Sequence, residues 1–173
     1  MNQSINIRDL VAPSDPILTQ ELPKFDFNNP VDDPIIVAKQ LAETMILHGG
    51  LGLSANQIGL QSRACVIQSN PIIAMFNPVI TAMSEDFKIL DEGCLSVPNF
   101  IVKVKRPLWV RVRYTQPNGT VMTEKFYGMT ARAVCHEVDH LNGILFYQRA
   151  SRYHLDRAKR KYKILQRRMK GSK

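Results

Sequence analysis

Residues 133–143 read AVCHEVDHLNG, and this short stretch predicts a helix that carries a metal site. His136 and His140 are four residues apart, so on a helix they lie about one turn apart and project to the same side. Two imidazoles in this arrangement can bind one metal ion, and Glu137 lies beside them as a base for a bound water. The alternative is a pair of ordinary surface or core histidines with a solvated glutamate. A metal site would need a further ligand from elsewhere in the chain.

The position of the third ligand separates several classes of zinc enzyme. In the extended motif HExxHxxGxxH a third histidine would stand at the position of Phe146. Thermolysin-like enzymes use a later glutamate, but no glutamate follows Glu137, and His154 lies at the edge of a basic tail. Upstream, Cys94 in DEGCLSVP (residues 91–98) would complete a four-coordinate site with an open catalytic position, together with two imidazoles and a water. From the residues alone, a strand cysteine without a metal role remains the alternative.

Length and composition indicate one ordinary globular domain. The chain has 173 residues, of which 45% are hydrophobic and 22% charged, and no apolar run is long enough for a membrane span. The N-terminal residues carry neither a signal-peptide nor a transit-peptide pattern, so the expected location is cytoplasmic. The three cysteines, Cys65, Cys94 and Cys135, are too few for a disulfide framework.

The net charge of +8 is concentrated at the C-terminal end. Residues 151–173 contain ten Lys/Arg and one acidic residue, a net charge of +9, whereas the rest of the chain has 13 Lys/Arg against 14 acidic residues. We therefore divide the sequence into a metallohydrolase domain, residues 1–150, and a basic C-terminal helix or tail of the same domain, residues 151–173. Charge confined to one segment concerns partners more than catalysis.

The expected helices are marked by caps and by apolar spacing. The first lies within DDPIIVAKQLAETMILHGG (residues 32–50), with Asp32 as its cap and Pro34 in its first turn. Its buried face is expected to include Ile36, Leu41 and Met45. Thr130 is expected to cap the helix that carries the histidines. The last helix, about residues 154–169, has a narrow apolar stripe on a basic cylinder, formed by Leu155, Ala158, Tyr162, Leu165 and Met169.

The segment between the first helix and the histidines has the pattern of β-structure. A glycine-bearing loop is expected at residues 51–61 and a strand at residues 63–68. Residues 74–127 are rich in strand-type sequence, and LWVRVRY at residues 108–114 alternates apolar and basic residues as a half-exposed strand does. The turn QPNGT then predicts a hairpin over residues 108–127.

Three stretches together resemble the signature motifs of the peptide deformylase family. They are GLGLSANQIG (residues 50–59), EGCLSVP (residues 92–98) and HEVDHLNG (residues 136–143), and their order and separations also match. The resemblance covers most of the chain up to about residue 146. It implies an α+β fold in which antiparallel strands surround a central metal-binding helix, followed by a C-terminal helix. It also makes Cys94 the third ligand beside the two histidines.

The resemblance implies a hydrolase that removes the formyl group from the N-terminal formyl-methionine of newly synthesised polypeptides and releases formate. A metal-bound water would attack the formyl carbonyl, while Glu137 takes a proton from this water and passes it to the departing amine. The Gln57 side chain and the backbone N–H of Leu95 would stabilise the oxyanion. The metal ligands would be Cys94, His136 and His140.

One divalent metal ion is the cofactor that the sequence implies. The ligand types tolerate Fe²⁺, Zn²⁺, Co²⁺ and Ni²⁺, so the residues alone do not choose among these ions. The resemblance implies Fe²⁺ as the native ion.

The resemblance also places an extended peptide substrate along the first motif. Gly52 would let the substrate backbone lie against the loop and add to a sheet edge, and a turn with positive φ is the plainer role of this glycine. Glu92 is expected to pair with Arg106 and brace the cysteine loop, and Asp139 to orient a ligand or cap structure. The pocket for the methionine side chain is assigned to Leu51, Met129 and Ala133. The full set of expected substrate-binding residues is Gly50, Leu51, Gly52, Glu92, Gly93, Met129, Arg132 and Ala133.

Three residues depart from the usual family pattern. Ser54 stands where alanine is frequent and adds a hydroxyl group. Cys135 stands where glutamine is usual, and because adjacent helical side chains diverge by about 100°, we do not expect it to bind the metal. Arg132 stands where aliphatic residues are usual, and we expect it to alter the rim of the substrate pocket.

The implied partners are N-formyl-methionyl nascent peptides and, through residues 151–173, the ribosome. A basic helix beside RNA gains affinity by releasing counterions, and without a base-reading motif the contact would not be sequence-specific. The plainer alternative is a helix that packs its apolar stripe on the body and leaves its charges in water. No membrane partner is expected. The rival functions are an HExxH peptidase that cuts internal amide bonds and a nucleic-acid-binding protein with a structural metal site.

Overall fold

The strands form two antiparallel sheets in the computed structural model, which describes residues 7–171. Residues 1–6, part of the N-terminal stretch expected to lack a targeting pattern, and residues 172–173 lie outside the described residues. The larger sheet has the strand order β1-β2-β3-β6-β7 and the smaller one consists of β4 and β5. The strands are β1 (Gly52–Ser54), β2 (Ala64–Ile67), β3 (Ile73–Met83), β4 (Phe87–Cys94), β5 (Val97–Pro107), β6 (Trp109–Thr115) and β7 (Val121–Tyr127).

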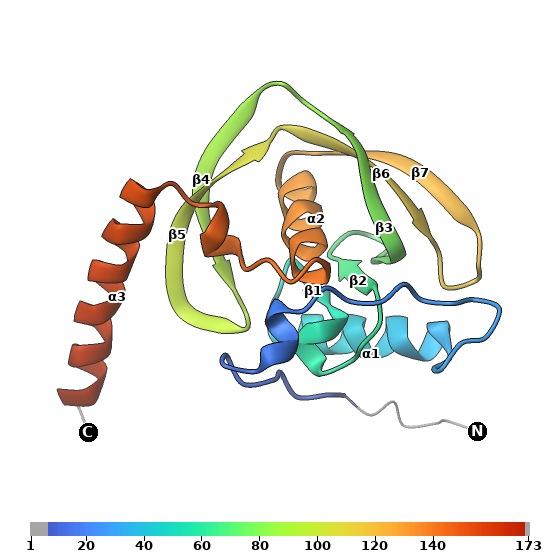
Figure 1. The fold of residues 1–173 in the computed structure, drawn as a ribbon, viewed down its shortest axis with the longest axis horizontal. Helices are drawn as coiled ribbons and strands as arrows, with labels where there is room; N and C mark the ends of the chain where they lie inside the picture. Colours follow the sequence, from blue (N-terminus) through green and yellow to red (C-terminus); the bar gives the residue numbers. More distant parts are fainter. Residues whose placement is uncertain (1–6, 172–173) are drawn as a thin grey trace.

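Helix α2 (Gly128–Leu141) lies at the centre, beneath the arch that the long strands form (Figure 1). It contacts β1, β2, β6 and β7 of the larger sheet and β5 of the smaller one. Helix α1 (Pro34–Leu47) packs below the larger sheet (Figure 1). Helix α3 (Arg152–Gly171) comes last in the chain and lies at the side of the molecule beyond β5 (Figure 1). This arrangement confirms the expected α+β fold with antiparallel strands around a central helix. The 3₁₀ helices are η1 (Pro16–Thr19), η2 (Ala55–Ile58) and η3 (Phe146–Arg149).

Helix α1 departs from expectation in two details. Its N-cap is Asp33, whose side chain accepts a hydrogen bond from the backbone N–H of Ile35, and not Asp32. Since Pro34 is the first helical residue, the cap must be the residue just before it. Leu41 and Met45 are fully buried as expected, but Ile36 is 40% exposed because it points about 100° away from the buried face.

The helix that carries the histidines also begins earlier than expected. Helix α2 starts at Gly128 with Tyr127 as its N-cap, so Thr130 lies inside the helix and does not cap it. Gly128 has φ +57, a left-handed conformation in which β7 runs directly into the helix. The hairpin expected over residues 108–127 is present as β6 and β7, paired from Trp109 with Tyr127 to Thr115 with Val121. The expected loop at residues 51–61 contains β1 and η2.

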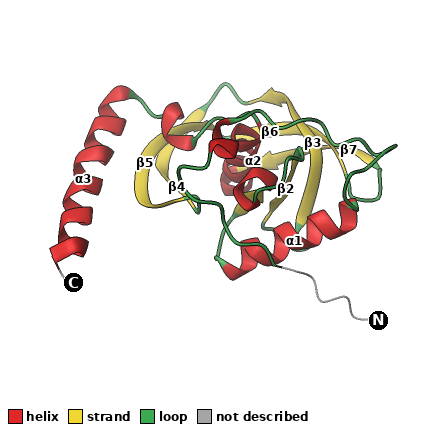
Figure 2. Cartoon of the chain, turned by 60° about the horizontal axis from the view of Figure 1, so that its bottom comes forward, coloured by secondary structure: helices red, strands yellow, loops and turns green. Residues whose placement is uncertain are grey.

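The rest of the protein covers only the first half of the apolar stripe on helix α3. The helix begins two residues before the expected start, and Leu155, Ala158 and Tyr162 pack against the cluster around Phe100. Leu165 and Met169 are 39% and 54% exposed, and the distal part of the helix stands apart from the body (Figure 2). Among residues 7–171, none of the helices has both the length and the apolar character needed to cross a membrane.

Candidate metal centre and active site

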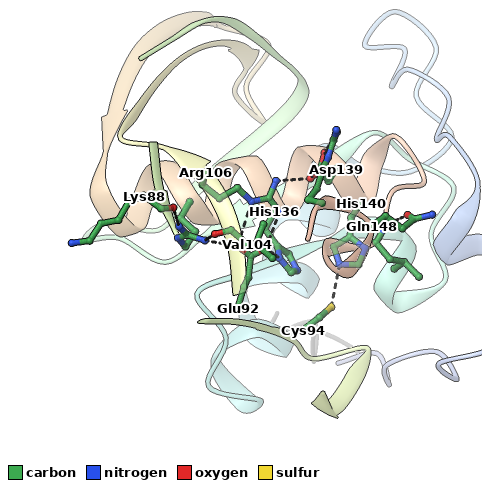
Figure 3. A network of polar contacts seen from close by, with 12 residues as sticks. Lys88, Glu92, Cys94, Val104, Arg106, His136, Asp139, His140 and Gln148 are labelled. Atoms are coloured by element: carbon green, nitrogen blue, oxygen red, sulfur yellow. Dashed lines mark hydrogen bonds and ion pairs between the residues drawn. The ribbon is translucent and has the colours of Figure 1, made fainter. Parts of the chain in front are cut away.

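Three side chains that can bind a metal meet beside α2. Cys94 ends β4, and His136 and His140 project from successive turns of α2. Their ligand atoms lie within 4.8 Å of one another, and Cys94 Sγ is 3.1 Å from His140 Nε2 (Figure 3). One thiolate and two imidazoles suit divalent iron, zinc, cobalt or nickel. The donor set therefore fits the single divalent ion that the sequence implies.

A carboxylate from β4 orients the first histidine. Nδ1 of His136 is 2.8 Å from Glu92 Oε1, which leaves Nε2 of the ring for a metal. Arg106 donates from Nη2 to Glu92 Oε1 at 2.7 Å and from Nε to Oε2 at 3.3 Å, so the expected pair of Glu92 and Arg106 is present (Figure 3). A carboxylate on the second nitrogen of a ligand histidine fixes the ring orientation.

The same arginine reaches a second carboxylate, on α2. Arg106 Nη1 is 2.5 Å from Asp139 Oδ2, and Arg149 Nη2 is 2.6 Å from Asp139 Oδ1. Asp139 is thus held between two guanidinium groups, and Arg106 connects the β4 carboxylate with the helix of the histidines. The network ties β4, which supplies Cys94, to α2.

Burial and hydrogen bonding set the charges of this network. Burial would raise the pKa of Glu92, but hydrogen bonds from His136 and Arg106 lower it to about 2. Burial would lower the pKa of His136, but hydrogen bonds with Cys94 and Glu92 raise it to about 10. Burial and the neighbouring His136 lower the pKa of His140. Because metals bind neutral imidazole, metal binding at His136 competes with a proton.

Glu137 is a buried carboxyl group beside the ligands. The residue is 3% exposed, and its Oε2 atom has no hydrogen-bond partner within residues 7–171. Burial raises the pKa of Glu137 to about 7, while the neighbouring His136 acts in the opposite direction. A carboxyl group with a near-neutral pKa and a free oxygen is suited to proton transfer.

The amide of Gln57 faces the metal ligands. Gln57 Nε2 lies 3.0 Å from Ser96 Oγ and 3.5 Å from Cys94 Sγ. Its Oε1 atom accepts a hydrogen bond from the backbone N–H of Ser54 at 2.9 Å. The donor end of the side chain therefore points toward the site, and Leu95 follows Cys94 in the same wall.

A cavity of about 510 Å³ opens onto these groups. Cys94, His136, Glu137, Gln57 and Leu95 line it, and all of the expected substrate-binding residues line it too: Gly50, Leu51, Gly52, Glu92, Gly93, Met129, Arg132 and Ala133. The sequence did not identify five further lining residues, namely Leu10, His48, Asp91, Pro98 and Asn99. Asp91, Pro98 and Asn99 lie within or directly after DEGCLSVP, and His48 lies two residues before the first motif, so closeness to the motifs was the signal that could have identified them. Leu10 comes from a distant segment and reaches the cavity only through folding.

Comparison with known proteins identifies the family. A family profile described as Polypeptide deformylase matches residues 7–156. The chain belongs to the peptide deformylase family. A peptide deformylase of Caldanaerobacter subterraneus is 38% identical over 148 residues, which cover 85% of this chain and 91% of the relative. One from Agrobacterium fabrum is 34% identical over 165 residues, which cover 91% and 95%.

Solved structures of the peptide deformylase family show the same fold. A peptide deformylase from Synechococcus elongatus in complex with actinonin matches with a TM-score of 0.81 and 34% identity, over 90% of this chain and 85% of that one. The Met-Ala-Ser-bound class I type b peptide deformylase from Acinetobacter baumannii matches with a TM-score of 0.77 and 30% identity, over 84% and 99%. The family resemblance and the expected enzyme class, a hydrolase acting on N-formyl-Met peptides, are confirmed.

The guanidinium of Arg132 was expected at the rim of the substrate pocket, but it lies elsewhere. This guanidinium is buried and does not extend over the rim of the cavity: Nη1 donates to Glu92 Oε2 at 2.9 Å and to the Val104 carbonyl at 3.1 Å, and Nη2 donates to the Lys88 carbonyl at 2.7 Å. These acceptors belong to β4 and β5, so Arg132 anchors that hairpin to the start of α2. The sequence showed that an arginine is unusual at this position, but it did not show where the guanidinium lies.

Cys135, the other departure on α2, is a core residue. It is 6% exposed and packs in the main hydrophobic cluster, outside the group formed by Cys94, His136 and His140. Burial raises the pKa of its thiol to about 11.

Gly52 lies so close to the Glu137 side chain that there is no room for a side chain of its own. A Cβ atom placed on it would lie 2.6 Å from Glu137 Oε1 and 2.8 Å from Glu137 Cγ, distances that real Cβ atoms do not adopt. Its φ is not positive, so the alternative of a left-handed turn is wrong and the close approach of Glu137 is the reason for glycine here.

Gly52→Ala is therefore expected to displace the Glu137 carboxyl group and to reduce formate release from an N-formyl-Met tripeptide by about 10²-fold, the effect of a displacement near 1 Å. Because Glu137 is outside the ligand group, the variant should keep its bound metal, which elemental analysis checks. Wild-type turnover in a folded, metal-loaded variant would contradict the steric argument.

Proposed function

We propose that this protein removes the N-formyl group from the formyl-methionine of newly synthesised polypeptides with one divalent metal held by Cys94, His136 and His140. The observation that carries the proposal is the meeting of a thiol and two imidazoles beside a cavity of a deformylase-family chain, next to a buried carboxyl oxygen of Glu137 that has no hydrogen-bond partner among residues 7–171. The family resemblance supports Fe²⁺ as the native ion, and the donor set would also accept Zn²⁺, Ni²⁺ or Co²⁺.

Glu137 supplies the proton transfers in the proposed reaction. When bound, the metal ion lowers the pKa of a water and polarises the formyl carbonyl. Glu137 takes a proton from the water whose oxygen attacks the formyl carbon. It then gives this proton to the peptide nitrogen as the C–N bond breaks, so that formate and a free amino group result. Its buried position next to the ligands supports both roles.

Gln57 and Leu95 stabilise the charge that develops on the formyl oxygen. The Gln57 amide already presents its N–H groups toward Cys94, and the backbone N–H of Leu95 follows that residue in the chain. Donors fixed before the reaction lower the barrier without reorganisation, and the loss of one such donor costs about 10²–10³ in rate.

The substrate peptide lies extended between β1 and the end of β4, with Gly52 and Gly93 close to its backbone. The proposed methionine pocket uses Leu51, Met129 and Ala133, which line the cavity. Leu51 and Met129 are 55% and 51% exposed, so a bound apolar side chain would cover them.

The test is formate release from an N-formyl-Met tripeptide by protein prepared without oxygen and loaded separately with Fe²⁺, Ni²⁺ or Zn²⁺. The same peptide without the formyl group is incubated in parallel. Metal-dependent formate release with intact internal peptide bonds is the expected result. No formate with any of the three ions, or equal cleavage of the unblocked peptide, would contradict the proposal and favour an HExxH peptidase.

We further propose that α3 contacts the ribosome. Its cationic residues and its uncovered stripe support this partner, since the distal half does not pack on the body. Reversing the charge of Lys163, Arg167 and Lys170 spares the packed segment up to Tyr162. The triple Glu variant should lose co-sedimentation with ribosomes at low salt, because each phosphate contact contributes to a salt-dependent affinity.

The triple Glu variant should hydrolyse a formyl-Met tripeptide at the wild-type rate, and this unchanged activity shows that the variant is folded. The contact is disproved when neither charge reversal nor deletion of residues 151–173 changes ribosome co-sedimentation.

A further inference from the structure

Ser54, the last residue of β1, is a fully buried polar residue outside the ligand group. Its backbone N–H donates to Gln57 Oε1, and its hydroxyl group, which has one proton to donate, lies between Gln57 Oε1 and Asn56 Oδ1. Its backbone N–H is 2.9 Å and its hydroxyl oxygen 3.0 Å from Gln57 Oε1. A backbone N–H can only donate, so the amide atom that it meets must be the carbonyl oxygen, and the hydroxyl proton can add a second bond to that oxygen.

The orientation of the Gln57 amide follows from these contacts. With Oε1 held by Ser54, the NH₂ group must occupy the opposite side, where it meets Ser96 Oγ and the Cys94 thiol. In the flipped amide, the NH₂ group would meet the Ser54 N–H donor and the carbonyl oxygen would face the sulfur of Cys94. The first contact would set two donors against each other, so Ser54 selects the orientation in which the NH₂ group faces Cys94.

The Ser54 hydroxyl also connects the oxyanion side of the site to the ligand helix. It lies 2.8 Å from Asn56 Oδ1, and Asn56 Nδ2 donates to the backbone carbonyl of His140 at 2.8 Å. An alanine at this position would retain the N–H bond to Gln57 but would lose the hydroxyl contacts with both amides.

We infer that Ser54 is a positioning residue that fixes the Gln57 amide with its N–H groups directed at the formyl oxygen. The inference rests on the proposed role of Gln57 in stabilising the oxyanion. A donor aligned before the reaction acts on charge that appears only in the transition state, so its misalignment lowers kcat and leaves KM nearly unchanged.

A double-mutant cycle tests the inference on the Ni²⁺-loaded full chain with an N-formyl-Met tripeptide. The variants are Ser54→Ala, Gln57→Ala, the double variant and Ser54→Thr, which keeps the hydroxyl. Ser62→Ala is the matched control, because Ser62 is also buried and its Oγ has no hydrogen-bond partner within the described residues.

Ser54→Ala is expected to lower kcat by about three- to tenfold, the effect of one hydrogen bond, and to have no further effect in the Gln57→Ala background. Ser62→Ala should retain wild-type kcat, and Ser54→Thr should retain most of it. Independently of turnover, the side-chain amide protons of Gln57 should exchange faster with solvent in Ser54→Ala, as measured by NMR on the Zn²⁺-loaded protein.

Equal losses of kcat in both backgrounds, or a change in KM alone, would overturn the role of Ser54. Full activity of Ser54→Ala beside an impaired Gln57→Ala would refute this inference and leave the proposed function intact. Full activity of Gln57→Ala would instead remove the assigned role of Gln57, and the inference with it.

Discussion

Glu137→Gln is expected to lower formate release by about 10²–10⁴-fold, the usual contribution of a general acid–base group. Glutamine keeps the size of the side chain but cannot accept the proton of the attacking water. Since Glu137 is buried and is not one of the three ligands, the variant should fold and retain its metal. The change therefore isolates proton transfer from metal binding.

The measurement is kcat for an N-formyl-Met tripeptide together with the metal content of the same sample. Glu85→Gln, at an exposed carboxylate between β3 and β4, is the matched control and should have wild-type kcat. A Glu137→Gln enzyme that keeps more than a tenth of wild-type turnover would exclude Glu137 as the base.

The pH profile of the wild-type enzyme follows from the same group. A base works only when deprotonated, and burial raises the pKa of Glu137 to about 7, so kcat/KM should fall as pH decreases below neutrality. A bound divalent cation favours the carboxylate and moves this acid limb to lower pH.

Glu92→Ala is expected to lower the free energy of unfolding by about 3–5 kcal/mol, the effect of removing one partner from a buried ion pair. The substitution leaves the guanidinium groups of Arg106 and Arg132 buried without their shared carboxylate. It also removes the acceptor at Nδ1 of His136, so metal affinity should fall by about 10–100-fold. Urea denaturation of metal-free protein at pH 7 and competition with a chelator measure the two effects.

The stability difference between wild type and Glu92→Ala should depend on pH. The folded-state pKa of Glu92, about 2, lies below its ordinary value of 4.5. Its ionised form therefore stabilises the fold above pH 4.5, and this stabilisation is lost as pH falls from 4.5 toward 2. Asp91→Ala is the control: Asp91 pairs with Lys103 on the surface, so its effect should stay below about 1 kcal/mol. Equal stability losses in the two variants would show that the buried network is not stabilising.

Spacing made the ligand helix predictable, and one family resemblance supplied the third ligand. His136 and His140 could be placed together because the helical repeat fixes their separation. Cys94 could not be placed by spacing, since it reaches the histidines across β5, β6 and β7. The hairpin of β6 and β7 was predictable because alternation and turn chemistry are local signals.

Local signals were insufficient where neighbours in space decide the outcome. Asp32 and Asp33 are equivalent caps by composition, and Thr130 has the chemistry of a cap, but β7 continues directly into α2 at Gly128. The charged end of Arg132 finds acceptors 28 to 44 residues away in the chain, at distances that no sequence pattern encodes. The cavity residue Leu10 was missed for the same reason, because it lies far before the first motif in the chain.

The division of the metal site between β4 and α2 also sets when it can form during synthesis. Cys94 and His140 are 46 residues apart, and the hairpin of β6 and β7 is made between them. An elongating chain carries the thiol well before it carries the imidazoles. The three-ligand site therefore cannot be complete until strands β1 to β7 and most of α2 have been synthesised.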